Sequence, residues 1–173
     1  MTRPNLRLLT TLALVVSPLL AVFPVIAQAD SVQYRQPSVA DLVTPVQAAQ
    51  ATLPKFLAHA IDRSGEGIRG TRLLIQLGEA PTTELIWVSP FFLLPEGGFA
   101  GHIAGLPVVL TGYIIGQKLP FEEAQIMDWA IYLDDGKIYG DYLLRAQLDQ
   151  MTPEDAARHS GTLSADPVPA AWK

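Results

Sequence analysis

Residues 126–146 read IMDWAIYLDDGKIYGDYLLRA, and they contain the clearest hairpin signal of the chain. Two mostly apolar segments, 126–133 and 137–146, flank Asp134-Asp135-Gly136. Glycine supplies the positive φ angle that a tight turn demands, so the pattern predicts a β-hairpin. We therefore expect two antiparallel strands toward the C-terminal end of the chain.

Further strands are expected upstream of this hairpin. Leu73, Ile75 and Leu77 alternate with polar neighbours, which is the period-two pattern of a half-buried strand. Turn residues at 78–81 and 95–98 separate this segment from its successors. The other expected strands are 84–89, 99–103 and the β-branched, apolar segment 108–115.

A helix is predicted ahead of the strands. Apolar residues recur at helical spacing from Leu42 to Ile61. Thr44 followed by Pro45 fits an N-cap and first helical position, although residues 38–41 offer an earlier start. Pro54 lies inside the pattern and lacks an N–H, so a kink is expected near it.

The chain ends with a second helix signal. Thr152 and Pro153 repeat the cap-then-proline start, and Gly161 supplies a stop. A helix, five or six strands and a short helix predict an α+β domain, with an amphipathic helix packed on a mostly antiparallel sheet. The expected organisation is a leader at 1–29, a flexible lead-in at 30–40, a single domain at 41–150, and a short helix with a loose tail at 151–173.

The leader resembles a cleavable signal peptide. Arg3 and Arg7 form a positive n-region, and residues 8–29 hold no charged side chain. Pro24 precedes Ala27-Gln28-Ala29, whose small residues fit a signal-peptidase site. We expect cleavage after Ala29 and export to the periplasm or beyond the cell.

An uncleaved membrane anchor is the alternative, because about 20 apolar residues can span a bilayer. Pro18, Pro24 and the small-residue site argue against it. No other membrane span is expected.

Composition excludes several function classes. The 173 residues include no cysteine, which excludes disulfides, thiol nucleophiles, and zinc or iron–sulfur sites held by cysteine. The formal charge is −5. The leader holds two of the twelve basic residues and none of the seventeen acidic ones, so its removal leaves −7. An acidic chain is a poor electrostatic match for nucleic acid or for an anionic membrane surface.

The histidines give no local support for a metal site. His59, His102 and His159 lie far apart in the sequence and form no metal-ligand motif. His59 is expected to face solvent, and His159 to lie in the last turn of the C-terminal helix. His102 points away from its apolar strand neighbours and is a candidate for acid–base chemistry. No cofactor is expected.

Three further residues are candidates for a site. Asp128 lies on an apolar strand face, so it either ties down backbone N–H groups or is a carboxylate with a perturbed pKa at the mouth of a site. Trp87 and Trp129 are candidate ligand-binding residues, with core or cross-strand packing as the alternative. Strand alternation predicts that Asp128 shares a face with Ile126, Ala130 and Tyr132, and that Trp129 shares one with Met127, Ile131 and Leu133.

Seven stretches between about Asp41 and Leu148 form an ordered signature: 51–56, 84–91, 98–101, 106–107, 112–116, 126–129 and 135–142. On these stretches, which occur in family order, the chain resembles the YegJ-like family of bacterial domains of unknown function. The resemblance implies a single compact domain, and it supplies no reaction, cofactor or catalytic residue.

Three functions are compatible with these patterns. The first is a non-catalytic, exported module that binds a protein or an envelope component. The second is a small periplasmic hydrolase that uses His102 with Asp128 or Glu84, which requires two of these side chains within hydrogen-bond distance. The third is an inhibitor or toxin-neutralising protein whose acidic charge attracts a basic partner.

Overall fold

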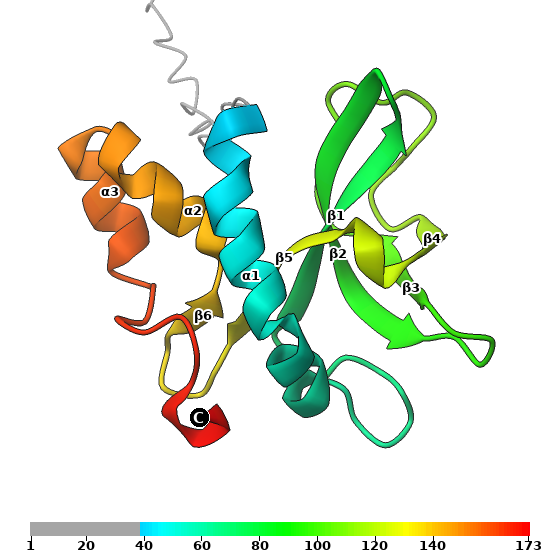
Figure 1. Ribbon diagram of the computed structural model, residues 1–173, viewed down its shortest axis with the longest axis horizontal. Helices are drawn as coiled ribbons and strands as arrows, with labels where there is room; N and C mark the ends of the chain where they lie inside the picture. Colours follow the sequence, from blue (N-terminus) through cyan, green and yellow to red (C-terminus); the bar gives the residue numbers. More distant parts are fainter. Residues whose placement is uncertain (1–38) are drawn as a thin grey trace, which may run out of the picture. The chain divides into compact units, whose positions relative to one another are not determined.

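The computed structural model describes residues 39–173, so the predicted leader and residues 30–38 of the predicted lead-in lie outside the described residues. Six antiparallel strands form one sheet in the order β4-β3-β2-β1-β5-β6 (Figure 1). This arrangement confirms the α+β class. The strands are β1 (Thr71–Glu79), β2 (Thr82–Leu93), β3 (Phe99–Ile103), β4 (Lys118–Phe121), β5 (Ile126–Tyr132) and β6 (Ile138–Gly140); the helices are α1 (Val39–Ala60), α2 (Tyr142–Gln147) and α3 (Pro153–Ser160).

Helix α1 packs on one face of the sheet along the stripe that the sequence predicts. Ala49, Leu53, Phe56 and Ala60 are buried in the core. The ring of Phe56 stacks on that of Trp129 in β5, with centroids 4.7 Å apart. The Nε1–H of Trp129 donates to Ala49 O and Thr52 Oγ1, at 3.2 and 3.1 Å. None of the helices in residues 39–173 is both long and apolar enough to cross a membrane.

Of the two starts predicted for this helix, the earlier one within residues 38–41 is confirmed and the one at Thr44 is wrong. The helix begins at Val39, so Thr44 and Pro45 lie inside it and two residues of the expected lead-in are helical. Pro45 is buried, and its packing offsets the hydrogen bond that its missing N–H forfeits. Pro54 also lies inside the helix, and the kink there stays a prediction.

The strand expected at 108–115 was also wrong. These residues form a loop. The next strand of the chain is β4, which pairs with β3 on the side away from β2. The backbone N–H groups of Val108, Val109 and Leu110 donate to the carboxylate of Glu84 instead of to a neighbouring strand. The Glu84 side chain therefore replaces the hydrogen bonds of a neighbouring strand. This tertiary contact outweighs the β-propensity of the segment.

The predicted hairpin is present, but its second strand is short. Gly136 has a φ of 76°, and β5 and β6 pair antiparallel. The strand expected over 137–146 ends at Gly140, because Gly140 and Asp141 both take left-handed φ angles, 72° and 54°. These two residues turn the chain out of the sheet and into α2.

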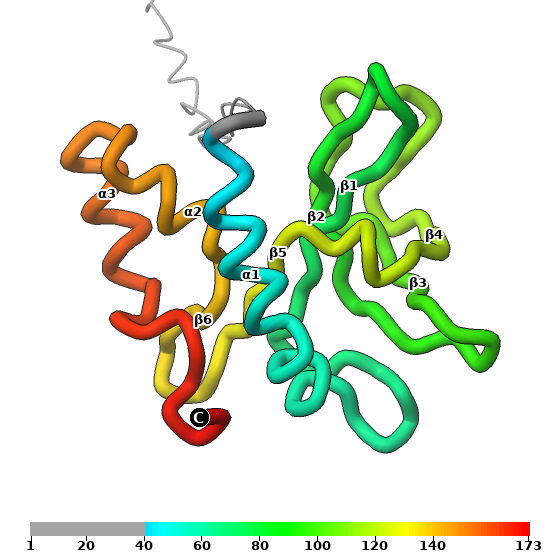
Figure 2. The backbone as a smooth tube through the Cα atoms, in the orientation of Figure 1, coloured from blue at the N-terminus to red at the C-terminus, as the bar shows by residue number. Residues whose placement is uncertain are grey.

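The start and end of α3 agree with the sequence, and the tail does not. Thr152 Oγ1 accepts the N–H of Asp155, Pro153 is the first helical residue, and the helix ends before Gly161. The predicted loose tail instead returns to the end of α1 (Figure 2). There the ring of Trp172 stacks on His59 at 5.0 Å and lies 6.4 Å from Phe56, so an apolar anchor fixes the C-terminus.

Substitution of Gly140 tests the turn into α2. An alanine Cβ there would overlap the carbonyl oxygen and ring of Trp129 in addition to straining the backbone. We expect Gly140→Ala to lower the free energy of unfolding by more than about 3 kcal/mol in urea denaturation. Gly112→Ala is the control: its φ of 88° is equally unfavourable but a Cβ meets no atom within 4 Å, so about 1 kcal/mol is expected. Equal losses would contradict the steric role of Gly140.

Candidate functional site

The sheet register divides the strand residues between two faces. Residues directly opposite each other in antiparallel strands project to the same side. Val88, Leu73 and Trp129 form one such row and belong to the core that α1 covers. Trp87, Leu74 and Asp128 form the next row, so they project to the opposite face.

Asp128 and Ile126 do not share a face as the sequence predicted. The register between β1 and β5 shifts, so that Leu74 pairs with Asp128 and Ile75 with Ile126. Met127 is the extra residue of this bulge. Ile126 consequently joins the core with Trp129, while Asp128 lies on the face away from α1.

Arg72 is held between a ring and a buried carboxylate on this second face. Its guanidinium carbon lies 4.3 Å from the centroid of the Trp87 ring. Its Nη2 donates to Asp141 Oδ2 at 2.6 Å. The Asp141 side chain is fully buried, whereas 37% of the Arg72 side chain is exposed. The cation is therefore fixed from the protein side and reaches solvent.

Asp141 is an expensive support for this cation. Its left-handed backbone is stabilised by its N–H, which donates to Trp129 O at 2.8 Å. Its Oδ1 is buried and accepts no hydrogen bond from residues 39–173. Burial raises the pKa of the Asp141 carboxyl, and the neighbouring charge of Arg72 opposes that rise. A half-satisfied buried carboxylate lowers stability, so its presence calls for a role.

Asp128 lies behind Asp141 and does tie down backbone N–H groups. Its Oδ1 accepts from Trp129 N at 2.7 Å, and its Oδ2 accepts from Leu143 N at 2.8 Å. The second bond caps the start of α2, since Asp141 at the N-cap position makes no side-chain cap of its own. Burial raises the pKa of Asp128 to about 7; the Leu143 N–H opposes the rise and the charge of Asp141 adds to it.

A second cation–aromatic pair lies on the same face. Lys118 Nζ is 4.2 Å from the centroid of the Phe92 ring. His102 is opposite Lys118 in the β3–β4 register, and its ring centroid is 6.4 Å from that of Phe92. We call these residues the cationic face: Arg72, Trp87, Phe92, His102 and Lys118.

The pairs that a hydrolase needs are not formed. Glu84 has the strand parity of Val88, and His102 that of the opposite face. Asp128 and His102 share a face, but two strands separate β5 from β3, which places their backbones about 14 Å apart. Trp129 lies in the core and Trp87 on the cationic face, so these two candidates are also on different faces.

The surroundings of Glu84, His59 and His159 indicate structural roles. The pKa of Glu84, which burial alone would raise, is lowered because the N–H groups of residues 108–110 stabilise its charge. His59 is exposed against Trp172, and His159 lies in the last turn of α3. Across residues 39–173, no three histidine, aspartate or glutamate side chains gather closely enough to hold a metal ion.

Sequence reasoning identified Trp87 and Asp128 but missed Arg72, Asp141 and Lys118. Arg72 and Asp141 are 69 positions apart, so nothing local connects them. The one usable signal was the alternation around Leu73, which already placed Arg72 on the face away from the core.

The raised pKa of Asp128 predicts a pH dependence of stability. Folded Asp128 titrates near 7 and its ordinary value is 3.8, so the folded state binds this proton more tightly. The contribution of this group is fully present below about pH 4 and is lost as the pH rises to about 7. Asp128→Asn lacks the titration. Between these pH values the unfolding free energy of the natural chain should therefore fall by a few kcal/mol relative to the variant in urea denaturation.

The control for that measurement is Asp134→Asn, at an exposed position in the hairpin turn. Its stability should follow the natural chain across the pH range. Parallel curves for Asp128→Asn and the natural chain would show that Asp128 does not titrate between these limits.

Glu84→Gln tests the anchoring of residues 108–110. Glutamine offers one acceptor oxygen and places an amide donor against the remaining N–H groups. We expect a stability loss of about 1–3 kcal/mol and faster hydrogen exchange of the Val108, Val109 and Leu110 amides, measured by NMR. Glu79→Gln at the exposed end of β1 should leave this exchange unchanged. Unchanged exchange in Glu84→Gln would contradict the anchoring role.

The chain matches a known family of bacterial proteins over most of its length. A family model described as "Uncharacterized protein conserved in bacteria (DUF2314)" matches residues 43–166, more than two thirds of the chain. Neither the curated proteins nor the solved structures contain a match. The matched range includes all six strands and α3, and therefore the whole of the cationic face. The chain belongs to the DUF2314 family of uncharacterised bacterial proteins.

Proposed function

We propose that the chain is an exported, non-catalytic binding module that holds an anionic group of a protein or envelope component on its cationic face. The position of Arg72 between Asp141 and Trp87 carries this proposal. Within the family, we place the chain with the YegJ-like domains on the stretches quoted above. Arg3, Arg7 and the uncharged residues 8–29 support export to the periplasm or beyond.

The guanidinium of Arg72 is suited to binding because its conformation is set in advance. One Nη2–H is used by Asp141, and the guanidinium has further donors at Nε and Nη1. Stacking on Trp87 restricts the side chain, so little conformational freedom remains to be lost when a ligand binds. Carboxylate and phosphate groups each present a pair of oxygens that matches this donor geometry.

The charge distribution also supports an anionic ligand. The chain as a whole is acidic, with a formal charge of −5. Arg72 and Lys118 nevertheless lie on one face with His102, and each cation rests on an aromatic ring. An anionic group approaching this face meets fixed positive charge, which favours its association and orientation.

The cost of Asp141 supports the same conclusion. A buried ion pair is often no more stable than an apolar pair of similar size. The ion pair of Asp141 with Arg72 therefore does little to offset the free energy lost by burying a half-satisfied carboxylate. Its clear effect is to hold Arg72 in place, which a binding role requires and a purely structural role does not.

Calorimetric titration with hexaglutamate and with inorganic polyphosphate tests the proposal, because the two probes distinguish carboxylate from phosphate. Arg72→Gln combined with Asp141→Asn removes the cation without leaving a buried unpaired charge. We expect binding to the preferred probe to weaken about tenfold or more. Binding of the natural chain should also weaken as salt is added.

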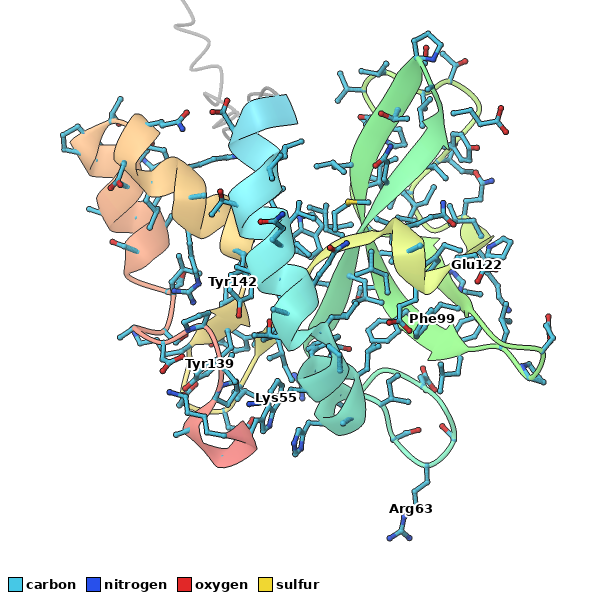
Figure 3. The ribbon with its side chains drawn as sticks, viewed as in Figure 1. Lys55, Arg63, Phe99, Glu122, Tyr139 and Tyr142 are labelled. Atoms are coloured by element: carbon cyan, nitrogen blue, oxygen red, sulfur yellow. The ribbon has the colours of Figure 1, made fainter. Side chains whose placement is uncertain are left out.

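Arg63→Gln combined with Asp134→Asn is the matched control, because both double variants lose one arginine and one aspartate and so leave the net charge unchanged. Arg63 extends from the loop after α1 away from the body of the domain (Figure 3). The affinity of this control should equal that of the natural chain. The proposal is wrong if the natural chain binds neither probe, or if both variants lose affinity to the same extent.

A further inference from the structure

Exposed aliphatic side chains are concentrated in one loop of the described structure. We call residues 104–117, between β3 and β4, the apolar loop; it contains no charged residue. Nine large hydrophobic side chains are exposed in residues 39–173, and five of them lie in this loop. These are Leu106 (70% exposed), Val108 (86%), Val109 (46%), Ile114 (68%) and Ile115 (57%).

The apolar loop is held in place at several points. Glu84 accepts three backbone N–H groups from residues 108–110. Leu110 and Tyr113 pack against the core. Gly116 N donates to Ile103 O at 2.8 Å, and Gly116 O is bonded to His102 Nδ1 at 2.9 Å. The structure therefore holds these side chains in solvent on a fixed backbone. Exposing them forgoes the free energy of burying apolar surface, and an isolated monomer gains nothing in return.

The chemistry of the loop fits a lipid surface better than a protein surface. Protein interfaces are enriched in tryptophan, tyrosine and arginine, which supply most of their binding energy. The exposed side chains here are leucine, valine and isoleucine, and the one aromatic residue, Tyr113, packs inward. Aliphatic side chains gain most from the acyl region of a bilayer, which rewards burial without demanding shape complementarity.

A cation lies where such a surface places phosphate groups. Lys118 follows the loop directly and is exposed. A side chain that enters the acyl boundary leaves neighbouring residues at the level of the headgroups, where lysine is favoured. In an otherwise acidic chain, the local positive charge of Lys118 thus agrees with apolar complementarity at the C-terminal end of the loop.

We propose that the apolar loop inserts its exposed leucine, valine and isoleucine side chains into the interface of a phospholipid bilayer and so docks the domain on a membrane. Lys118 belongs to both surfaces, but insertion of the loop does not involve Arg72, so the proposal holds even if Arg72 binds no anion. An exported domain would meet such a surface on the outer side of the cytoplasmic membrane.

The absence of cysteine from the natural chain allows a local test. In the full chain, Val108→Cys is labelled with a fluorophore that is sensitive to polarity and mixed with vesicles of phosphatidylcholine, with or without phosphatidylglycerol. We expect a blue shift of the emission and protection from aqueous iodide. A label at Leu93→Cys, at an exposed position at the end of β2, should show neither change. The local label separates the loop from any membrane contact made elsewhere in the chain.

A second variant measures the contribution of the side chains. Val108→Ser and Ile114→Ser are introduced together into the chain labelled at Ile115→Cys. This variant should require about tenfold more lipid for the same blue shift than the chain that carries Ile115→Cys alone. Each substitution is at an exposed position, so thermal melting should be unchanged. The proposal is overturned if the label at residue 108 stays in water while the chain binds vesicles, or if the label at residue 93 responds equally. It is also overturned if the chain binds vesicles of neither composition. A blue shift that grows with protein concentration alone would assign the loop to a second copy of the chain instead.

Discussion

The buried side chain of Trp129 fixes how α1, α2 and the C-terminal tail pack on the sheet. Its ring stacks on Phe56 of α1 and contacts Tyr142 of α2 and Trp172 of the tail. Its Nε1–H donates to the backbone of α1, and its own backbone N–H is bonded to Asp128. A single fully buried residue therefore joins the sheet to three segments that are far apart in sequence. The hydroxyl contact between Thr52 and Tyr142, 2.9 Å long, closes the same junction between α1 and α2.

This junction also fixes the charged residues of the cationic face. Trp129 O accepts the N–H of Asp141, and this bond holds the left-handed turn that aims the Asp141 carboxylate at Arg72. Asp128, one residue before Trp129, caps the helix that begins immediately after Asp141. Core and site are thus not separate layers. Two buried carboxylates, both with raised pKa values, lie between the apolar core and the partly exposed guanidinium of Arg72.

Local patterns predicted the parts of the fold that local energies decide. The helical stripe through Leu53 and Phe56, the turn at Gly136 and the cap at Thr152 each depend on a few neighbouring residues. The failures came from contacts between distant residues. Residues 108–110 leave the sheet because Glu84, 24 to 26 positions away, satisfies their N–H groups. Ile126 changes face because of a bulge against β1, and Arg72 meets Asp141 across 69 positions. Side-chain alternation does not encode a bulge, so the sequence could suggest Asp128 as a site residue without showing which face it occupies.

Glu84 and Asp141 show the same physical solution at two places in the sheet. Each is a buried carboxylate, and each holds another group in a position that faces solvent: Asp141 holds a guanidinium, and Glu84 holds the backbone of an exposed apolar loop. Burying a charge is justified energetically only when its partners satisfy it, and Glu84 is satisfied by three donors where Asp141 has one. Their pKa values accordingly move in opposite directions. The loop is therefore anchored over the whole range in which Glu84 is ionised, whereas the hold on Arg72 weakens first as the pH falls, so the two surfaces respond differently to acid.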